Sequence, residues 1–228
     1  MKKIVIVLII AILIVASVVG VSFYNGKKKE KNTNGNNQIA QTEQYYGNRG
    51  NISQAEKIKF LSKDDEYLIG MMGLPVSNNV TEFSNENMIK FALNIAVERY
   101  SNILTEKKDK NGVSYLVPKE VINAITDEYF DIKEVTFDAN NSEYYSKANK
   151  AFLYGINIEK TLYYYPVDMQ TNGDNKEIIV DAIFVKDNQN DSEIESAKYE
   201  GKYQKEDVDN TVKFIFNKSG KLVSYQYQ

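Results

Sequence analysis

The chain has 228 residues and a net charge of −3 at neutral pH, and it contains no histidine, cysteine or tryptophan. Without cysteine and histidine it has no disulfide, thiol nucleophile, zinc–thiolate centre, Ser-His-Asp triad or imidazole metal ligand, which excludes most hydrolase and metalloenzyme mechanisms. Residues 1–35 carry six lysines and one glutamate, so the rest of the chain has a net charge of −8 and is expected to repel nucleic-acid backbones.

An uncharged apolar run of 21 residues, from Ile4 to Tyr24, follows the basic start of the chain. About 20 apolar residues of helix cross the hydrocarbon core of a membrane, whereas a cleaved signal peptide has a shorter apolar region of about 7–15 residues. The length therefore predicts a transmembrane anchor within residues 1–24. Cleavage after Ser22, with Gly20 three residues before the cut, is the alternative and would give a secreted protein.

The lysines around this run leave its orientation open. Two precede it and four follow it, at Lys27, Lys28, Lys29 and Lys31, so charge alone slightly favours a cytoplasmic C-terminus. Long domains translocate largely regardless of flanking charge. We therefore expect a single-pass protein at the cell membrane with its C-terminal part on the outer side.

Residues 25–54 are rich in asparagine, glycine, glutamine and lysine, and their few apolar residues have no period. This composition predicts a flexible linker with a root-mean-square reach of about 30 Å. The remaining residues, 55–228, are enough for one domain with a sizeable core.

The first part of this domain has helical periodicity. A short helix is expected within residues 55–75. Ser84 is a good N-cap for a helix that continues to about residue 104, with Glu86 in its first turn. Residues 113–117 are expected to be extended, and Pro118 suits the first position of a second helix. Residues 132–138 alternate and are expected to form a strand, and residues 141–150 are expected to form a short third helix.

The last third has the composition of strands. Two β-branched and aromatic runs, 160–170 and 176–187, flank Asn172-Gly173, a strong hairpin signal. A polar loop over 188–195 precedes three more expected strands at 197–204, 211–217 and 221–228, the last two joined by a second hairpin. Helices followed by antiparallel strands predict an α+β fold with helices packed on one face of a sheet.

This order of elements, over Ser84 to Gln228, resembles the NTF2-like cone fold and the cystatin-like arrangement. It is also similar to small membrane-anchored or secreted domains of Firmicutes without an assigned activity, and the abundance of lysine, asparagine and isoleucine is typical of a low-GC Gram-positive bacterium. The sequence VPKEVINAITDEYFDIKEVTF carries most of the likeness. The resemblance implies a curved antiparallel sheet with a concave face, and it assigns no site residues.

Asp181 is the most conspicuous polar residue, because it interrupts the apolar run IIVDAIFV. On a strand it shares a face with Ile179 and Ile183. In a concave pocket its carboxylate would be a candidate base. The alternative is a polar residue that faces solvent at an ordinary strand alternation.

Tyrosines are unusually frequent in the expected sheet. Successive strand residues face opposite sides, so some of these rings are expected to lie away from the core, where they could stack on sugars or anchor a protein interface. Strand propensity is the alternative explanation. The candidate binding surface consists of Tyr163, Tyr164, Tyr165, Tyr199, Tyr203, Tyr225 and Tyr227, with Asp181.

Two acidic loops, Asp187–Glu193 and Asp138–Glu143, supply oxygen ligands, but neither has the spacing of an EF-hand, and we expect no metal or cofactor. The sequence thus predicts a non-catalytic, membrane-anchored extracytoplasmic module that binds an envelope protein or a wall polymer. The alternatives are a regulator or inhibitor of wall-remodelling enzymes, a carboxylate enzyme that uses Asp181, or a domain that only assembles a larger membrane complex.

Overall fold

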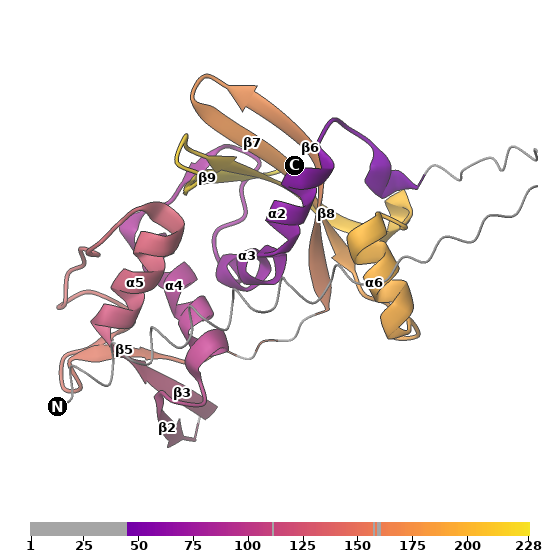
Figure 1. The fold of residues 1–228 in the computed structure, drawn as a ribbon. Helices are drawn as coiled ribbons and strands as arrows, with labels where there is room; N and C mark the ends of the chain where they lie inside the picture. The colour runs from indigo at the N-terminus through magenta and orange to yellow at the C-terminus, as the bar shows by residue number, and fades with distance from the viewer. Residues whose placement is uncertain (1–44, 111, 157, 159–160) are drawn as a thin grey trace, which may run out of the picture. The chain divides into compact units, whose positions relative to one another are not determined.

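The structure is a computed structural model that describes residues 45–110, 112–156, 158 and 161–228 (Figure 1). The predicted anchor over residues 1–24 and the linker residues 25–44 lie outside the described residues. The compact unit that contains the described residues begins at Glu43, upstream of the predicted boundary at residue 55. Among the described residues, no helix has the length and apolar character to cross a membrane.

The described unit is α+β, as predicted. Its helices are η2 (Tyr46–Asn48), α2 (Gln54–Leu61), α3 (Asp64–Met71), α4 (Asn85–Tyr100), α5 (Lys119–Phe130), α6 (Asp191–Glu200) and η3 (Lys205–Asp207). Its strands are β1 (Thr81–Glu82), β2 (Thr105–Asp109), β3 (Gly112–Val117), β4 (Tyr145–Ser146), β5 (Ala151–Tyr154), β6 (Leu162–Asn172), β7 (Asn175–Phe184), β8 (Val208–Phe216) and β9 (Leu222–Tyr227).

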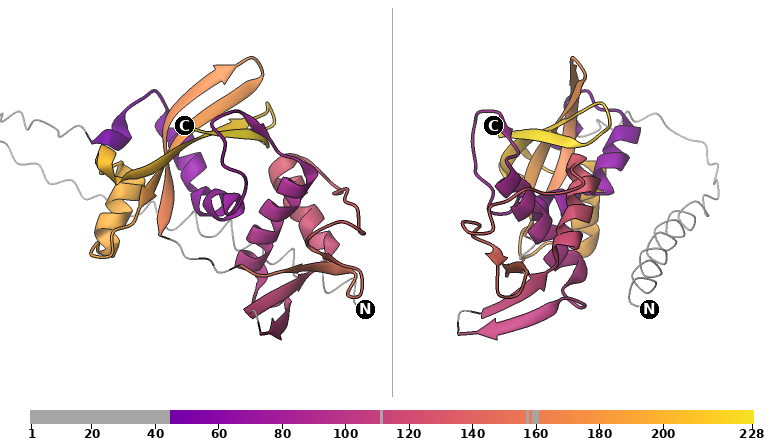
Figure 2. Two further views of the ribbon diagram at one scale, coloured as in Figure 1. Left: turned by 180° about the vertical axis from the view of Figure 1, so that it is seen from behind. Right: turned by 90° about the vertical axis from the view of Figure 1, so that its left-hand side faces the viewer.

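The strands form two antiparallel sheets rather than the one predicted sheet. The main sheet has the order β1-β9-β8-β7-β6, and the small sheet has the order β2-β3-β5-β4. The predicted hairpin at Asn172-Gly173 is confirmed, since Asn172 pairs with Asn175 and Gly173 has a φ of +60°. In Figures 1 and 2, α4 and α5 lie between the small sheet and the main sheet.

The principal core lies on one face of the main sheet, against α3, α4 and α5. It joins Phe214 of β8 to Phe91 of α4 and also includes Phe152 of the small sheet. The predicted start of α4 is confirmed, because the Ser84 hydroxyl accepts a hydrogen bond of 3.2 Å from the Asn87 N–H. The broad apolar stripe of α4 is buried because elements pack on several of its sides.

The opposite face of the main sheet is also covered, by α6 and by the N-terminal segment. A second cluster there includes Tyr165, Ala197 of α6 and Tyr203. The predicted loop at 188–195 and strand at 197–204 are wrong, because α6 occupies most of this stretch. Its capping box consists of Asn190 and Glu193.

Two further predictions between α5 and β5 are wrong. Residues 132–138 are not a strand, because their backbone bonds to α5: the Val135 N–H donates to Asn123 Oδ1 and Thr126 Oγ1 donates to the Ile132 carbonyl. Residues 141–150 are not a helix. Asp138 Oδ1 accepts from the Asn140 N–H at 2.8 Å, which closes a turn, and β4 follows.

Candidate functional site

Asp181 lies in the middle of β7, between Tyr165 of β6 and Thr211 of β8 on the neighbouring strands. Its side chain is 0% exposed. Arg49 binds both carboxylate oxygens, with Nη1 2.6 Å from Oδ2 and Nη2 2.7 Å from Oδ1. The hydroxyls of Tyr203 and Thr211 donate to the same carboxylate at 2.7 and 3.2 Å. We call these four residues the Arg49–Asp181 cluster.

The cluster attaches the N-terminal segment to the sheet. Arg49 lies 3.7 Å above the ring of Tyr46, and the Tyr46 N–H donates to the Tyr203 carbonyl at 3.1 Å. Tyr46 packs on the second cluster while Ile52 packs on the principal core, so the segment passes around the outer edge of β6. Residues 45–54 are therefore part of the fold rather than linker.

The surroundings of Asp181 differ from both predictions for it. It does not face solvent, because α6 and the N-terminal segment cover this face of the sheet, and it does not line the groove described below. Burial lowers the pKa of Arg49, but the hydrogen bonds and charge of Asp181 outweigh burial, and the net effect raises it. Burial and the neighbouring Asp181 carboxylate raise the pKa of Tyr203. To act as a base, Asp181 would have to give up this set of hydrogen bonds.

The predicted tyrosine surface is largely internal. Tyr199 is 50% exposed on α6, and Tyr227 is half-buried. The other five are buried: Tyr163, Tyr164, Tyr165, Tyr203 and Tyr225. The physical reason is that both faces of the sheet are covered, so rings on either face are packed. Burial raises the pKa of the Tyr225 hydroxyl to about 12. The buried hydroxyl of Tyr163 has no hydrogen-bond partner among the described residues.

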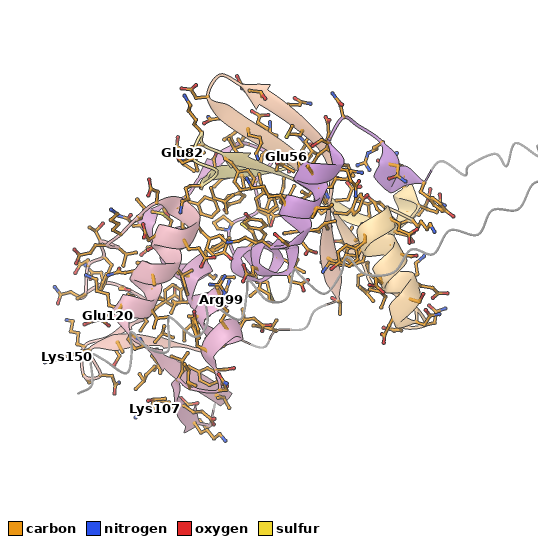
Figure 3. All side chains as sticks on the ribbon, viewed as in Figure 1. Glu56, Glu82, Arg99, Lys107, Glu120 and Lys150 are labelled. Carbon is orange, nitrogen blue, oxygen red and sulfur yellow. The ribbon has the colours of Figure 1, made fainter. Side chains whose placement is uncertain are left out.

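A hollow of about 260 Å³ lies elsewhere, where α2 and α5 meet the ends of β7 and β8. We call it the α2–α5 groove. Its floor contains apolar and aromatic side chains and its rim is charged. The lining residues are Glu56, Lys59, Phe60, Ser62, Lys63, Tyr67, Glu128, Tyr129, Lys176, Ile178, Phe216 and Gly220. Figure 3 shows Glu56 on α2.

Two ion pairs flank this groove. Lys176 Nζ lies 2.9 Å from Glu56 Oε2, and Lys63 Nζ lies 2.7 Å from Glu128 Oε1. Lys59 of α2 lies one turn after Glu56 and is exposed, and its ammonium group has no partner among the described residues. The groove thus combines an apolar floor with the ammonium group of Lys59, which has no hydrogen bond or ion pair in the described structure.

A charge network behind the groove ties α3, α4 and α5 together. Arg99 donates to Glu66 at 2.9 Å, to Glu128 at 2.8 Å and to the Tyr129 hydroxyl at 2.9 Å (Figure 3 labels Arg99). Tyr129 in turn donates to Glu66. Burial raises the pKa of Glu128, but hydrogen bonds from Arg99 and Lys63 outweigh burial and lower it to about 2. The groove is therefore backed by carboxylates that are already paired.

Asp64, at the start of α3, is a further buried acid outside the groove. Burial raises its pKa to about 6, although Lys198 of α6 opposes the rise from 3.1 Å away. The pair links α3 to α6.

The two acidic loops with oxygen ligands, Asp187–Glu193 and Asp138–Glu143, contain residues with structural roles. Glu193 belongs to the capping box of α6, and Asp138 accepts hydrogen bonds within its own turn. Within residues 45–228, apart from the four that are not described, no group of three or more acidic side chains is placed to hold a metal ion.

No protein-family model, curated protein or solved structure matches this chain. Neither the α2–α5 groove nor the partner of Asp181 is predicted by the sequence pattern. The signals present were the charged residues spaced along α2 and a lone arginine in an otherwise polar stretch.

Proposed function

We propose that the chain is a single-pass membrane protein whose residues 43–228 form a non-catalytic binding module on the outer side of the membrane. Its partner is an envelope protein or a wall polymer. The apolar run Ile4–Tyr24 supports the anchor. The fold proposal, the NTF2-like class, is supported by the antiparallel main sheet with α3, α4 and α5 packed on one face, although α6 covers part of the other face.

The observation that carries the binding role is the α2–α5 groove. Pockets that bind small ligands or anchor side chains combine an apolar surface with a few polar groups that fix orientation. The groove has this composition, and within the described part of the chain the ammonium group of Lys59 on its rim has no partner. Its volume of about 260 Å³ suits one large side chain rather than a whole drug-sized ligand.

The carboxylate-enzyme alternative is less favoured by the geometry. Asp181 accepts hydrogen bonds from Arg49, Tyr203 and Thr211 and is fully buried. The carboxylates nearest the groove, Glu56 and Glu128, are each paired with a lysine. A general acid or base needs access to substrate, and these groups offer it only after their ion pairs break. The regulator or inhibitor alternative is a binding role and would use the same surface.

Three experiments test the proposed function. Protease treatment of intact cells should remove residues 43–228 while cytoplasmic markers survive; protection until lysis would contradict the external location. Crosslinking in intact cells, followed by identification of the captured protein or polymer, should give a partner of the envelope. Reproducible turnover of a substrate that Asp181→Asn abolishes without unfolding the chain would contradict the non-catalytic assignment.

A further inference from the structure

We infer that the α2–α5 groove binds an acidic peptide segment of a partner protein, with an apolar side chain on the groove floor and a carboxylate at Lys59. This inference rests on the proposed binding role and adds the site and the chemistry of the ligand.

The floor of the groove consists of apolar and aromatic side chains that are each less than a tenth exposed. It is formed by Phe60, Tyr67 and Phe216, whose rings pack on one another: Phe60 stacks on Tyr67 with centroids 5.1 Å apart, and Phe216 meets Tyr67 edge-on at 6.0 Å. Ile178 completes this part of the lining. These side chains are held in the principal core, so the floor is rigid before a ligand arrives, which lowers the entropic cost of binding.

The rim selects for negative charge. It carries Lys59, Lys63 and Lys176 against two glutamates, a local excess of positive charge in a part of the chain whose net charge is −8. A carboxylate that approaches Lys59 forms a new ion pair and breaks none in the described structure. Lys63 and Lys176 are already paired with Glu128 and Glu56, at 2.7 and 2.9 Å, so the excess positive charge of the rim is that of Lys59.

A peptide fits these features better than a phosphate-rich wall polymer does. A polyanionic polymer of sugars or alditols would satisfy the lysines but has no large apolar group for the floor. A peptide supplies both, because its sequence can place an aromatic anchor next to an acidic residue, and aromatic anchors in pockets carry much of the binding energy of protein interfaces.

The test uses the full chain in non-ionic detergent and fluorescence anisotropy of a labelled peptide. The probe is a capped peptide of sequence Glu-Glu-Phe-Glu-Glu. The comparison peptides are Glu-Glu-Ala-Glu-Glu, which lacks the anchor, and Lys-Lys-Phe-Lys-Lys, which has the opposite charge. Linear inorganic polyphosphate is the competitor that represents a wall polymer. The protein variants are Lys59→Glu and, as a matched charge reversal, Lys107→Glu on β2, which is exposed and lies in the small sheet.

We expect saturable binding of the phenylalanine peptide, at least about tenfold weaker binding by the alanine and lysine peptides, and about a tenfold loss with Lys59→Glu. Lys107→Glu should leave the affinity within about twofold. The inference is overturned if no peptide binds or if the phenylalanine and alanine peptides bind with the same affinity. It is also overturned if Lys59→Glu and Lys107→Glu reduce the affinity equally. Displacement of the phenylalanine peptide by polyphosphate, at the same concentration of negative charges as the peptide, would overturn it as well. Any of these results leaves the protease-protection test of external location unaffected, so failure of the two proposals is distinguishable.

Discussion

Replacing Arg49 by methionine should destabilise the fold by about 3 kcal/mol. Removing one partner of a buried ion pair costs about 3–5 kcal/mol, because the other charge stays buried without compensation. Here the side chain of Arg49 is 32% exposed and that of Asp181 is 0% exposed, so the charge left behind is the fully buried one. The Tyr203 and Thr211 hydroxyls still donate to it, which places the loss near the lower end of that range.

The measurement is urea unfolding followed by the near-ultraviolet circular dichroism of the tyrosines. In thermal unfolding of the same variants, the melting temperature should fall by about 2–4 °C for each kcal/mol of lost stability. The double variant Arg49→Met with Asp181→Asn should recover more than half of the loss, since it buries no charge. Arg49→Lys should be intermediate, because an ammonium group cannot bind both oxygens in the fork geometry. A loss below about 1 kcal/mol in Arg49→Met, or a double variant less stable than the single one, would refute this reasoning.

Three other predictions concern buried groups. Burial raises the pKa of Asp64 to about 6, so the folded state favours the protonated form of this carboxyl group. The contribution of Asp64 to the free energy of unfolding should therefore fall by about 3 kcal/mol as the pH rises from about 4 to about 6. Urea unfolding at a series of pH values measures this decline, and Asp64→Asn should remove it. Tyr203→Phe should lower the free energy of unfolding by about 1.5–3 kcal/mol, because it removes a hydrogen bond to the Asp181 carboxylate. Tyr163→Phe should leave the free energy of unfolding unchanged or raise it by up to about 1 kcal/mol, because the Tyr163 hydroxyl has no partner among the described residues. Equal effects of the two variants in urea unfolding would contradict this prediction. Gly70→Ala should lower the melting temperature, because the new Cβ would lie 2.3 Å from the ring of buried Phe91. This clash should outweigh the gain of about 1 kcal/mol in helix propensity. A higher melting temperature would show that the Phe91 ring can move away.

The elements predicted correctly are those whose signals are local. Ser84 caps α4 through a neighbour three residues away, and Asn172-Gly173 forms its turn without help from the rest of the chain. The sequence pattern does not predict α6 because the apolar signal of this helix is weak: Ala197 is its one buried residue. The capping box of Asn190 and Glu193 is the local signal for its start. Tertiary contacts, not propensity, decide residues 132–138.

The environment of Asp181 could not be predicted from its own strand. An interrupting carboxylate on an apolar strand has to be either solvated or paired, and the pairing cation here is 132 residues away in the sequence. It also lies in a stretch whose composition predicts a linker. Likewise, exposed tyrosines follow from strand alternation only if one face of the sheet is open, and α6 closes that face.

The scarcity of arginine has a structural as well as a compositional meaning. The chain has two arginines, Arg49 and Arg99, and every other basic residue is a lysine. Both arginines bind several acceptors at once: Arg49 takes both oxygens of Asp181, and Arg99 joins two glutamates and a tyrosine. A planar guanidinium makes such contacts and an ammonium does not. In this lysine-rich chain both arginines lie where the fork geometry is used, and Arg49 binds the N-terminal segment to the sheet. A boundary at residue 55 would remove Arg49 and leave Asp181 as an uncompensated charge beneath α6.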